Sequence, residues 1–198
     1  MIFRNITANI KTTDFDFDEI YPIEVKNISD IHFTPVDISI LVARYLVTNK
    51  DSKILDIGSG VGKFCLIGSA CSEGTFTGVE QRQKFCAIAD DIVIKFNLSN
   101  VTFIHSNITD VIFSDYTAFY FFNAFNENKH MANRIDDEAL LGENLYEVYS
   151  NYVKEQLDIM PKGTKLVTYF SYSSEIPDSY KLMESSFEGK LKYWEKSE

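Results

Sequence analysis

The sequence has few of the residues that cross-link chains or hold metals. It contains three cysteines in 198 residues, Cys65, Cys71 and Cys86, and they lack the close, paired spacing of a metal site. We therefore expect buried free thiols, two on one helix and one on the next. No apolar stretch is long enough to span a bilayer, and no basic segment followed by a long apolar run opens the chain, so we expect no signal peptide. These absences favour a cytoplasmic protein without a membrane partner.

The chain also lacks an excess of basic residues. Nineteen Lys and Arg stand against 29 Asp and Glu, a formal net charge of −10. An acidic protein repels a phosphate backbone unless it carries a basic patch. The lysines near the C-terminus alternate with glutamates, which is typical of a solvated mixed-charge surface. The composition therefore disfavours a nucleic-acid partner.

The length fits one domain with one substantial core, and we expect a single domain over residues 1–198. Residues 1–33 have no clear periodicity and are interpreted as an N-terminal arm. Within them, residues 14–18 alternate acid and aromatic, which is compatible with a short edge strand or with an extended segment lying on the domain. Residues 34–198 form the expected α/β core.

That core shows a regular alternation of apolar runs and helical patterns. Thr34 and Pro35 predict a helix start, as a hydroxyl cap followed by proline, with an apolar face through about residue 48. This alternation predicts an open, doubly wound and mostly parallel sheet with right-handed crossovers. Expected strands are 53–57, 75–80, 101–105, 117–123, 165–170 and 190–194, and expected crossover helices are 61–71, 82–96 and 143–160.

The first strand ends in a glycine-rich turn. Residues 53–62 read Lys-Ile-Leu-Asp-Ile-Gly-Ser-Gly-Val-Gly, a short apolar run followed by Gly58, Gly60 and Gly62. A residue without a Cβ can adopt positive φ and lets a ligand approach the backbone. The pattern predicts a cofactor turn between a strand and a helix.

An acidic residue closes the second strand. Glu80 follows Gly58 by about 20 positions, the spacing expected of a carboxylate that binds ribose hydroxyls. Dinucleotide-binding turns have a third glycine after two intervening residues, but here the residue three positions beyond Gly60 is Lys63. The glycine spacing therefore favours S-adenosylmethionine over a nicotinamide dinucleotide.

Residues 54–62 and the Thr-Gly-Val-Glu of residues 77–80 resemble the first motif and the acidic-loop motif of class I S-adenosylmethionine-dependent methyltransferases. The sequences of these two motifs are similar to those of non-SET histone-lysine methyltransferases and of small bacterial methyltransferases. The resemblance covers about residues 33–170 and implies a Rossmann-like sheet. Such enzymes usually carry a seventh, antiparallel strand, and we expect this chain to stop short of it.

The resemblance implies a set of cofactor contacts. Asp56 would brace the turn, and Asn107 and Ile108, after the third strand, would contact the adenine ring. The alternative interpretation of Asn107 is the cap of an ordinary turn. The expected cofactor-binding residues are Asp56, Gly58, Ser59, Gly60, Gly62, Glu80, Gln81, Asn107, Ile108 and Asn123.

The end of the fourth strand resembles the Asn-aromatic motif of N-methyltransferases. Its sequence is Phe-Phe-Asn-Ala-Phe over residues 121–125, with Ala124 in place of the usual proline. An Asn that closes an apolar strand needs a polar partner. Asn123 and Phe125 are therefore the expected catalytic residues, binding an amine through the carboxamide and an aromatic face. The acceptor, a protein lysine or a small molecule, is not specified.

Three neighbouring features are open. Residues 31–35 could cover the cofactor or form only a capped helix start. Residues 126–137 are interpreted as a polar loop above the sheet, with acids that are better explained as solvated surface than as an attraction for a cationic substrate. His32 and His105 could act as bases, although a single histidine is more often structural.

Two other functions are compatible with part of this pattern. A nicotinamide-dependent oxidoreductase is disfavoured by the glycine spacing and by the lack of a Tyr-x-x-x-Lys pair, since Val153 and Gln156 follow Tyr149 and Tyr152 by four positions. A non-catalytic module that keeps the cofactor pocket is compatible with the substituted Asn123 loop.

Overall fold

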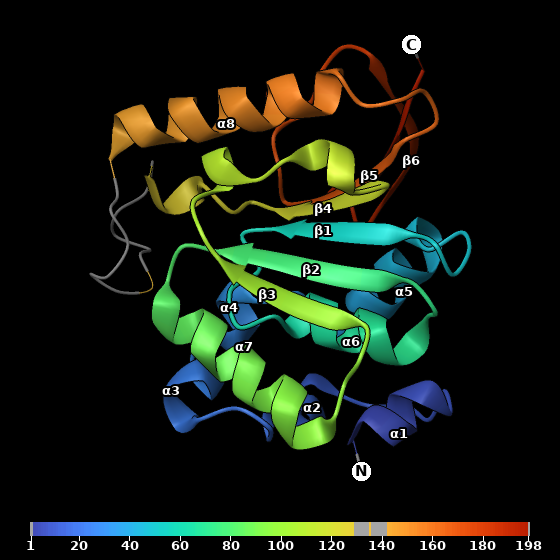
Figure 1. The fold of residues 1–198 in the computed structure, drawn as a ribbon, viewed down its shortest axis with the longest axis vertical. Helices are drawn as coiled ribbons and strands as arrows, with labels where there is room; N and C mark the ends of the chain where they lie inside the picture. The colour runs from blue at the N-terminus through green and yellow to red at the C-terminus, as the bar shows by residue number, and fades with distance from the viewer. Residues whose placement is uncertain (1, 129–134, 136–141, 198) are drawn as a thin grey trace.

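The computed structural model describes residues 2–128, 135 and 142–197. Its strands alternate with helices over most of the chain, as Figure 1 shows. The strands are β1 Lys53–Ile57, β2 Thr75–Glu80, β3 Val101–His105, β4 Ala118–Phe122, β5 Lys165–Tyr169, β6 Tyr180–Ser186 and β7 Leu191–Lys196. The α-helices are α1 Ile2–Thr7, α2 Asp14–Asp18, α3 Ile23–Lys26, α4 Ser29–His32, α5 Val36–Leu46, α6 Lys63–Cys71, α7 Gln83–Phe96 and α8 Glu143–Asp158. Short 3₁₀ turns include η1 Ile108–Asp110, η2 Phe113–Asp115, η3 Asn126–Asn128 and η5 Ser173–Glu175.

The seven strands form one sheet in the order β3-β2-β1-β4-β5-β7-β6. β3, β2, β1, β4 and β5 pair in parallel, which confirms the doubly wound α/β fold class. β7 pairs antiparallel with both β5 and β6. The expectation that the chain stops short of the antiparallel strand was wrong. β6 was missed because it is an edge strand whose residues 181–185 are exposed, so it carries no alternating apolar pattern.

The sheet separates two apolar cores because its central strands are buried on both faces. On β1, Ile54 packs into the core beneath α5, α6 and α7, while Leu55 and Ile57 pack into the core beneath α8. On β4, Tyr120 lies in the first core and Phe119 in the second. The unbroken apolar run of β4 therefore lies at the centre of the sheet, as its sequence predicts, and both layers are visible in Figure 1.

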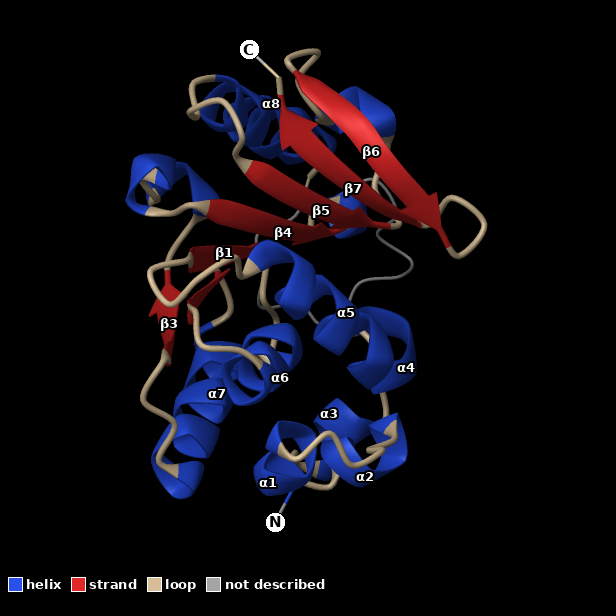
Figure 2. Cartoon of the chain, turned by 90° about the vertical axis from the view of Figure 1, so that its right-hand side faces the viewer, coloured by secondary structure: helices blue, strands red, loops and turns tan. Residues whose placement is uncertain are grey.

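The N-terminal segment is a helical layer. Figures 1 and 2 place α1, α2 and α3 on the far side of α6 and α7 from the sheet. The prediction of an edge strand or extended segment at residues 14–18 was wrong, because these residues form α2. Thr13 and Asp16 make a capping box there, with the Thr13 side chain accepting from the Asp16 backbone and the Asp16 carboxylate accepting from Thr13. Phe17 is fully buried in the first core. The alternation of acidic and aromatic residues therefore belongs to a helix that packs through Phe17, not to a strand.

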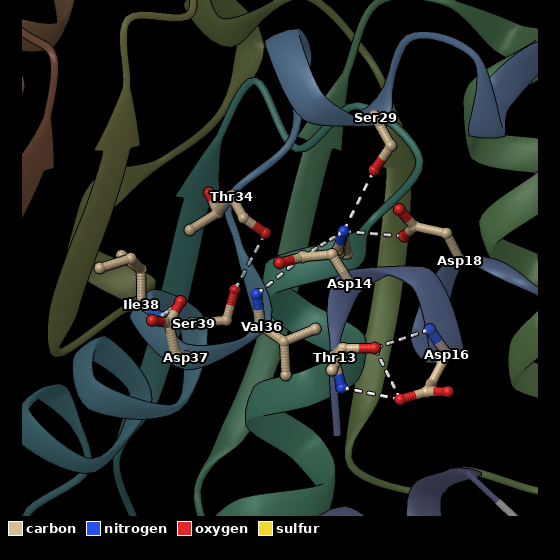
Figure 3. A network of polar contacts seen from close by, with 11 residues as sticks. Thr13, Asp14, Asp16, Asp18, Ser29, Thr34, Val36, Asp37, Ile38 and Ser39 are labelled. Atoms are coloured by element: carbon tan, nitrogen blue, oxygen red, sulfur yellow. Dashed lines mark hydrogen bonds and ion pairs between the residues drawn. The ribbon is translucent and has the colours of Figure 1, made fainter. Parts of the chain in front are cut away.

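A buried cation joins this layer to the sheet domain. The Lys63 ammonium lies 2.7 Å from Asp14 Oδ1, 2.7 Å from Asp18 Oδ1 and 3.1 Å from Ser29 Oγ (Figure 3). Lys63 is 2% exposed, so its charge must be paired in place. Since Lys63 is the first residue of α6, this pairing positions the N-terminal layer against the helix that follows the glycine turn.

The start of α5 differs from its sequence-based interpretation. Pro35 is the N-cap residue and makes no side-chain cap, and the Thr34 hydroxyl instead lies 2.8 Å from the Tyr120 hydroxyl. The first free N–H of the helix, on Val36, donates to Asp14 Oδ1 at 3.0 Å. The cap therefore comes from 22 residues earlier in the chain, which a local pattern cannot show.

All three cysteines are free, as expected; Cys65 and Cys86 are buried, whereas Cys71 is only half-buried. Among residues 2–128, 135 and 142–197, no helix has the length and apolar character that a membrane crossing requires.

Candidate cofactor and acceptor site

A pocket of about 710 Å³ lies at the carboxyl ends of the parallel strands. Ligands bind at this edge in open α/β sheets, where the loops after adjacent strands diverge. The pocket is bounded by the turn after β1, the end of β2, the loops after β3, β4 and β5, and the segment that joins α4 to α5. Its lining includes Asp30, His32, Phe33, Gly58, Gly60, Glu80, Gln81, Arg82, Asn107, Ile108, Phe122, Asn123, Phe125, Glu127, Tyr149, Tyr169 and Phe170.

The glycine turn has the conformation that its sequence predicts. Gly58, Gly60 and Gly62 have φ values of +74°, +55° and +79°. A Cβ on Gly60 would lie 2.8 Å from the Phe33 ring, and one on Gly58 would lie 2.4 Å from the Ala124 Cβ. The missing side chains therefore let the turn approach both the α4–α5 segment and the loop after β4.

Glu80 connects this turn to the second strand. Its carboxylate accepts from the Gly60 N–H at 3.0 Å and from the Arg82 N–H at 2.9 Å, and Oε1 lies 3.6 Å from the Arg82 guanidinium. Burial raises the pKa of Glu80, while the backbone bonds and Arg82 oppose the rise. Glu80 lines the pocket, and its contact with ribose hydroxyls stays a prediction.

Asp56, at the end of β1, and Ser59 and Gly62, within the turn, are not among the pocket-lining residues. Asp56 is buried and accepts from the Cys65 thiol at 3.5 Å, and desolvation raises its pKa to about 7. The Ser59 N–H donates to the Val79 carbonyl, so Ser59 fastens the turn to β2. These residues support the turn, and their direct contact with a cofactor stays a prediction.

After β3, Ile108 and Asn107 line the pocket. The Asn107 carboxamide oxygen accepts from both the N–H and the hydroxyl of Thr109, and its amide nitrogen donates to Tyr149 Oη at 2.9 Å. Asn107 therefore caps η1, which was the alternative interpretation, and its contact with adenine stays a prediction. Gln81 also lines the pocket, and its carbonyl lies 3.1 Å from a ring nitrogen of His105.

Asn123 comes directly after β4 and has φ +43°, a left-handed conformation that Asn tolerates better than most residues. Its backbone N–H donates to Ser171 Oγ at 3.3 Å. Its side-chain Oδ1 is buried and has no hydrogen-bond partner among the described residues. A buried acceptor without a partner costs free energy, so this oxygen is a candidate acceptor for a ligand donor, which the side chain must turn to meet because the atom itself is buried.

The aromatic candidates separate into two groups. Phe125 and Phe33 line the pocket, and Phe125 packs against Phe121 and Tyr149 with ring centroids 5.3 and 5.5 Å apart. Tyr120, in the middle of β4, is buried in the first core and is not among the lining residues. His32 lines the pocket, and desolvation is the main cause that lowers its pKa, whereas His105 is exposed on β3.

Sequence reasoning missed several residues of the site. Arg82 is buried and pairs with Glu127 at 2.8 Å as well as with Glu80. The interpretation of Glu127 as solvated surface was wrong, because it is half-buried and lines the pocket. The rest of the predicted polar loop, including Asp136, Asp137 and Glu138, lies outside the described residues apart from Ile135 and η3. Tyr169 and Phe170 were also missed, although their position after β5 was a usable signal.

The parallel sheet, the antiparallel β7 between β5 and β6, and the glycine turn facing Glu80 define the class I methyltransferase fold. Solved structures with this fold include an S-adenosylmethionine-dependent O-methyltransferase from Thermotoga maritima, with TM-score 0.56, 17% identity, and coverage of 89% of this chain and 72% of that one. An RNA methyltransferase from Salinibacter ruber in complex with S-adenosyl-L-homocysteine has TM-score 0.55, 17% identity, and coverage of 82% and 90%.

TrmN from Thermus thermophilus has TM-score 0.57, 14% identity and coverage of 82% of this chain, which spans 48% of TrmN, about half its length. Identities this low show a shared fold alone. No protein-family model matches the sequence, and no curated protein matches it either.

Proposed function

We propose that this protein is an S-adenosylmethionine-dependent methyltransferase that acts on a nitrogen atom. The observation that carries the proposal is the partnerless Asn123 Oδ1 in a residue that lines the pocket. The Asn123 loop lies next to the glycine turn, since Ala124 occupies the space that a Gly58 side chain would need. An acceptor N–H bound at Asn123 is therefore held beside the cofactor turn.

The pocket residues fit the cofactor chemically. Gly58 and Gly60 let the turn pack closely against Ala124 and Phe33 at the pocket wall, and Glu80 is a carboxylate of the kind that accepts from ribose hydroxyls. Val79 and Ile108 give apolar surface for the adenine ring.

The reaction asks little of the protein beyond alignment and exclusion of water. S-adenosylmethionine supplies a sulfonium methyl, which passes to a neutral amine as the C–S bond breaks with its electron pair left on sulfur, and the new ammonium then loses one proton. Asn123 orients the amine by accepting one N–H once the nitrogen is neutral. His32 is a candidate acceptor for the released proton, because its lowered pKa leaves the imidazole neutral near pH 7.

A protein lysine or a small amine is the acceptor that we propose, and the acidic net charge disfavours nucleic acid. The test is transfer of tritiated methyl groups from S-adenosylmethionine into fractionated cell lysate. Asn123→Gly is a more informative variant than Asn123→Ala, because glycine removes the carboxamide and can keep the positive φ of this position. We expect it to abolish labelling while the cofactor Kd, measured by titration calorimetry, changes less than about twofold.

The outcomes separate the alternatives. Equal labelling by Asn123→Gly would remove the catalytic assignment. Cofactor binding without labelling by the unmodified protein would indicate the non-catalytic module. The proposal would be overturned if neither S-adenosylmethionine nor S-adenosylhomocysteine bound to the folded protein.

A further inference from the structure

Three aromatic side chains meet at the β4–β5 end of the pocket. Phe122 and Tyr169 are register partners on adjacent strands, with ring centroids 4.9 Å apart. Phe170 follows, with its ring 4.6 Å from Tyr169 and 6.0 Å from Phe122. All three line the same pocket as Asn123. We call Phe122, Tyr169 and Phe170 the aromatic subsite.

The backbone holds this cluster in an uncommon conformation. Phe170 has φ +53°, a region that bulky residues seldom occupy. It occupies the position after β5 that Asn123 occupies after β4, and Asn123 also has positive φ. Phe170 stays 45% exposed, so the strained conformation does not bury its ring. Backbone strain of this kind clusters at functional sites, although Phe187, which does not line the pocket, also has φ +50° in a turn.

The angles between the rings select the shape of the ligand. The ring planes of the aromatic subsite meet at 36°, 48° and 67°. These inclined rings offer no parallel pair between which a flat heterocycle could stack, whereas an ammonium group is stabilised by any ring face within about 6 Å of it. Phe170 already engages one cation, since Lys190 Nζ lies 5.4 Å from its ring centroid.

The surrounding charges point in the same direction. Asp30 lines the pocket, and Asp37 is close enough to act electrostatically on Tyr169. Among the described cations near the pocket, Arg82 is paired with Glu80 and Glu127, and Lys190 is paired with Glu188 at 3.6 Å. The net charge of −10 gives the protein an overall attraction for cations.

We infer that the aromatic subsite binds the methyl acceptor as an alkylammonium ion, with one N–H directed at Asn123 Oδ1. This deepens the proposed function and rests on it. The cation is recognised by the three ring faces and by Asp30. It then passes one proton to water or to His32, which leaves the neutral nitrogen that the transfer requires.

The test uses the full chain, saturated with S-adenosylhomocysteine, and follows its NMR spectrum during titration. The probes are n-butylammonium, its neutral counterpart 1-butanol, and the flat neutral base 9-methyladenine. We expect n-butylammonium to bind at least several-fold more tightly than 1-butanol, with shifts at Asn123, Tyr169 and Phe170. Phe170→Leu should reduce that preference by roughly 2- to 30-fold, the range of one cation–π contact.

Two controls keep the result interpretable. Phe187→Leu removes another half-exposed aromatic ring, on a turn that does not line the pocket, and should leave the preference unchanged. Should Phe170→Leu fold poorly, Tyr169→Leu provides the same test on the neighbouring ring.

The outcomes of the titration distinguish failure of the inference from failure of the proposed function. Equal binding of n-butylammonium and 1-butanol, or tighter binding of 9-methyladenine, would overturn the inference and leave the proposed function standing. Failure of S-adenosylhomocysteine to bind would overturn the proposed function instead, together with the inference that rests on it.

Discussion

Asn123 and Ser171 are joined across the ends of two adjacent strands. The Asn123 backbone N–H donates to Ser171 Oγ at 3.3 Å, and the Ser171 hydroxyl lies 3.3 Å from the Phe121 and Tyr169 carbonyls, each a possible acceptor. Ser171 is buried, so one side chain satisfies backbone groups of both β4 and β5 where the sheet ends. This contact holds the Asn123 carboxamide at the pocket and makes Ser171 a positioning residue.

Ser171→Ala should therefore impair catalysis more than stability. Loss of the hydroxyl leaves buried backbone groups without a partner and should lower the free energy of unfolding by about 1–3 kcal/mol. Movement of Asn123 by a fraction of an ångström should lower kcat by about 10- to 100-fold, with the cofactor Kd nearly unchanged. Ser174→Ala, at an exposed position three residues on, is the control. An equal loss in cofactor affinity and kcat would indicate a merely structural role.

Glu80→Gln should weaken cofactor binding and preserve the fold. The amide keeps the size of the side chain but replaces one acceptor oxygen by a donor, so ribose hydroxyls lose a charged partner. We expect the free energy of cofactor binding to become less favourable by about 1–3 kcal/mol, as measured by titration calorimetry. Glu73→Gln, which neutralises an exposed carboxylate, should have no effect. Unchanged affinity in Glu80→Gln would show that the carboxylate serves only Gly60 and Arg82.

Lys63→Met should detach the N-terminal layer. The substitution leaves Asp18 buried at 6% exposure next to Asp14 without their shared cation. Breaking a buried pair costs about 3–5 kcal/mol, and partial exposure of Asp14 puts the expected loss near the lower limit. Limited proteolysis should then cut residues 8–33 faster, while Lys84→Met, which breaks an exposed pair with Glu24, should change stability by less than about 1 kcal/mol.

The sheet and the cofactor turn were predictable because their signals are local. An apolar run, three spaced glycines and Glu80 specify strand, turn and acid without reference to distant residues, and the structure confirms each of them. The position of Asn123 at the end of β4 was predictable for the same reason, whereas its catalytic role stays a prediction.

The features that were missed depend on contacts between distant segments. Asp14 caps α5 and pairs with Lys63 only after the N-terminal layer has folded over α6. Tyr169 and Phe170 join Phe122 only through strand pairing. β6 packs no regular apolar face, and its sequence therefore resembles a loop. The sequence pattern alone does not predict these contacts between distant segments.

Asp56 gives a pH dependence of stability whose sign is fixed by burial. Desolvation raises its pKa from 3.8 to about 7 in the folded protein. Between these values the folded state keeps a proton that the unfolded state has lost, so the free energy of unfolding falls as pH rises, by about 1.4 kcal/mol per unit at most, and levels off above pH 7. Asp56→Asn cannot ionise and should escape this loss. From pH 5 to pH 8 its stability, measured by urea denaturation, should rise relative to that of the unmodified protein by roughly 2–3 kcal/mol. Parallel stability curves over that interval would show that Asp56 is already ionised at pH 5, and that the Cys65 thiol and nearby dipoles fully offset its burial.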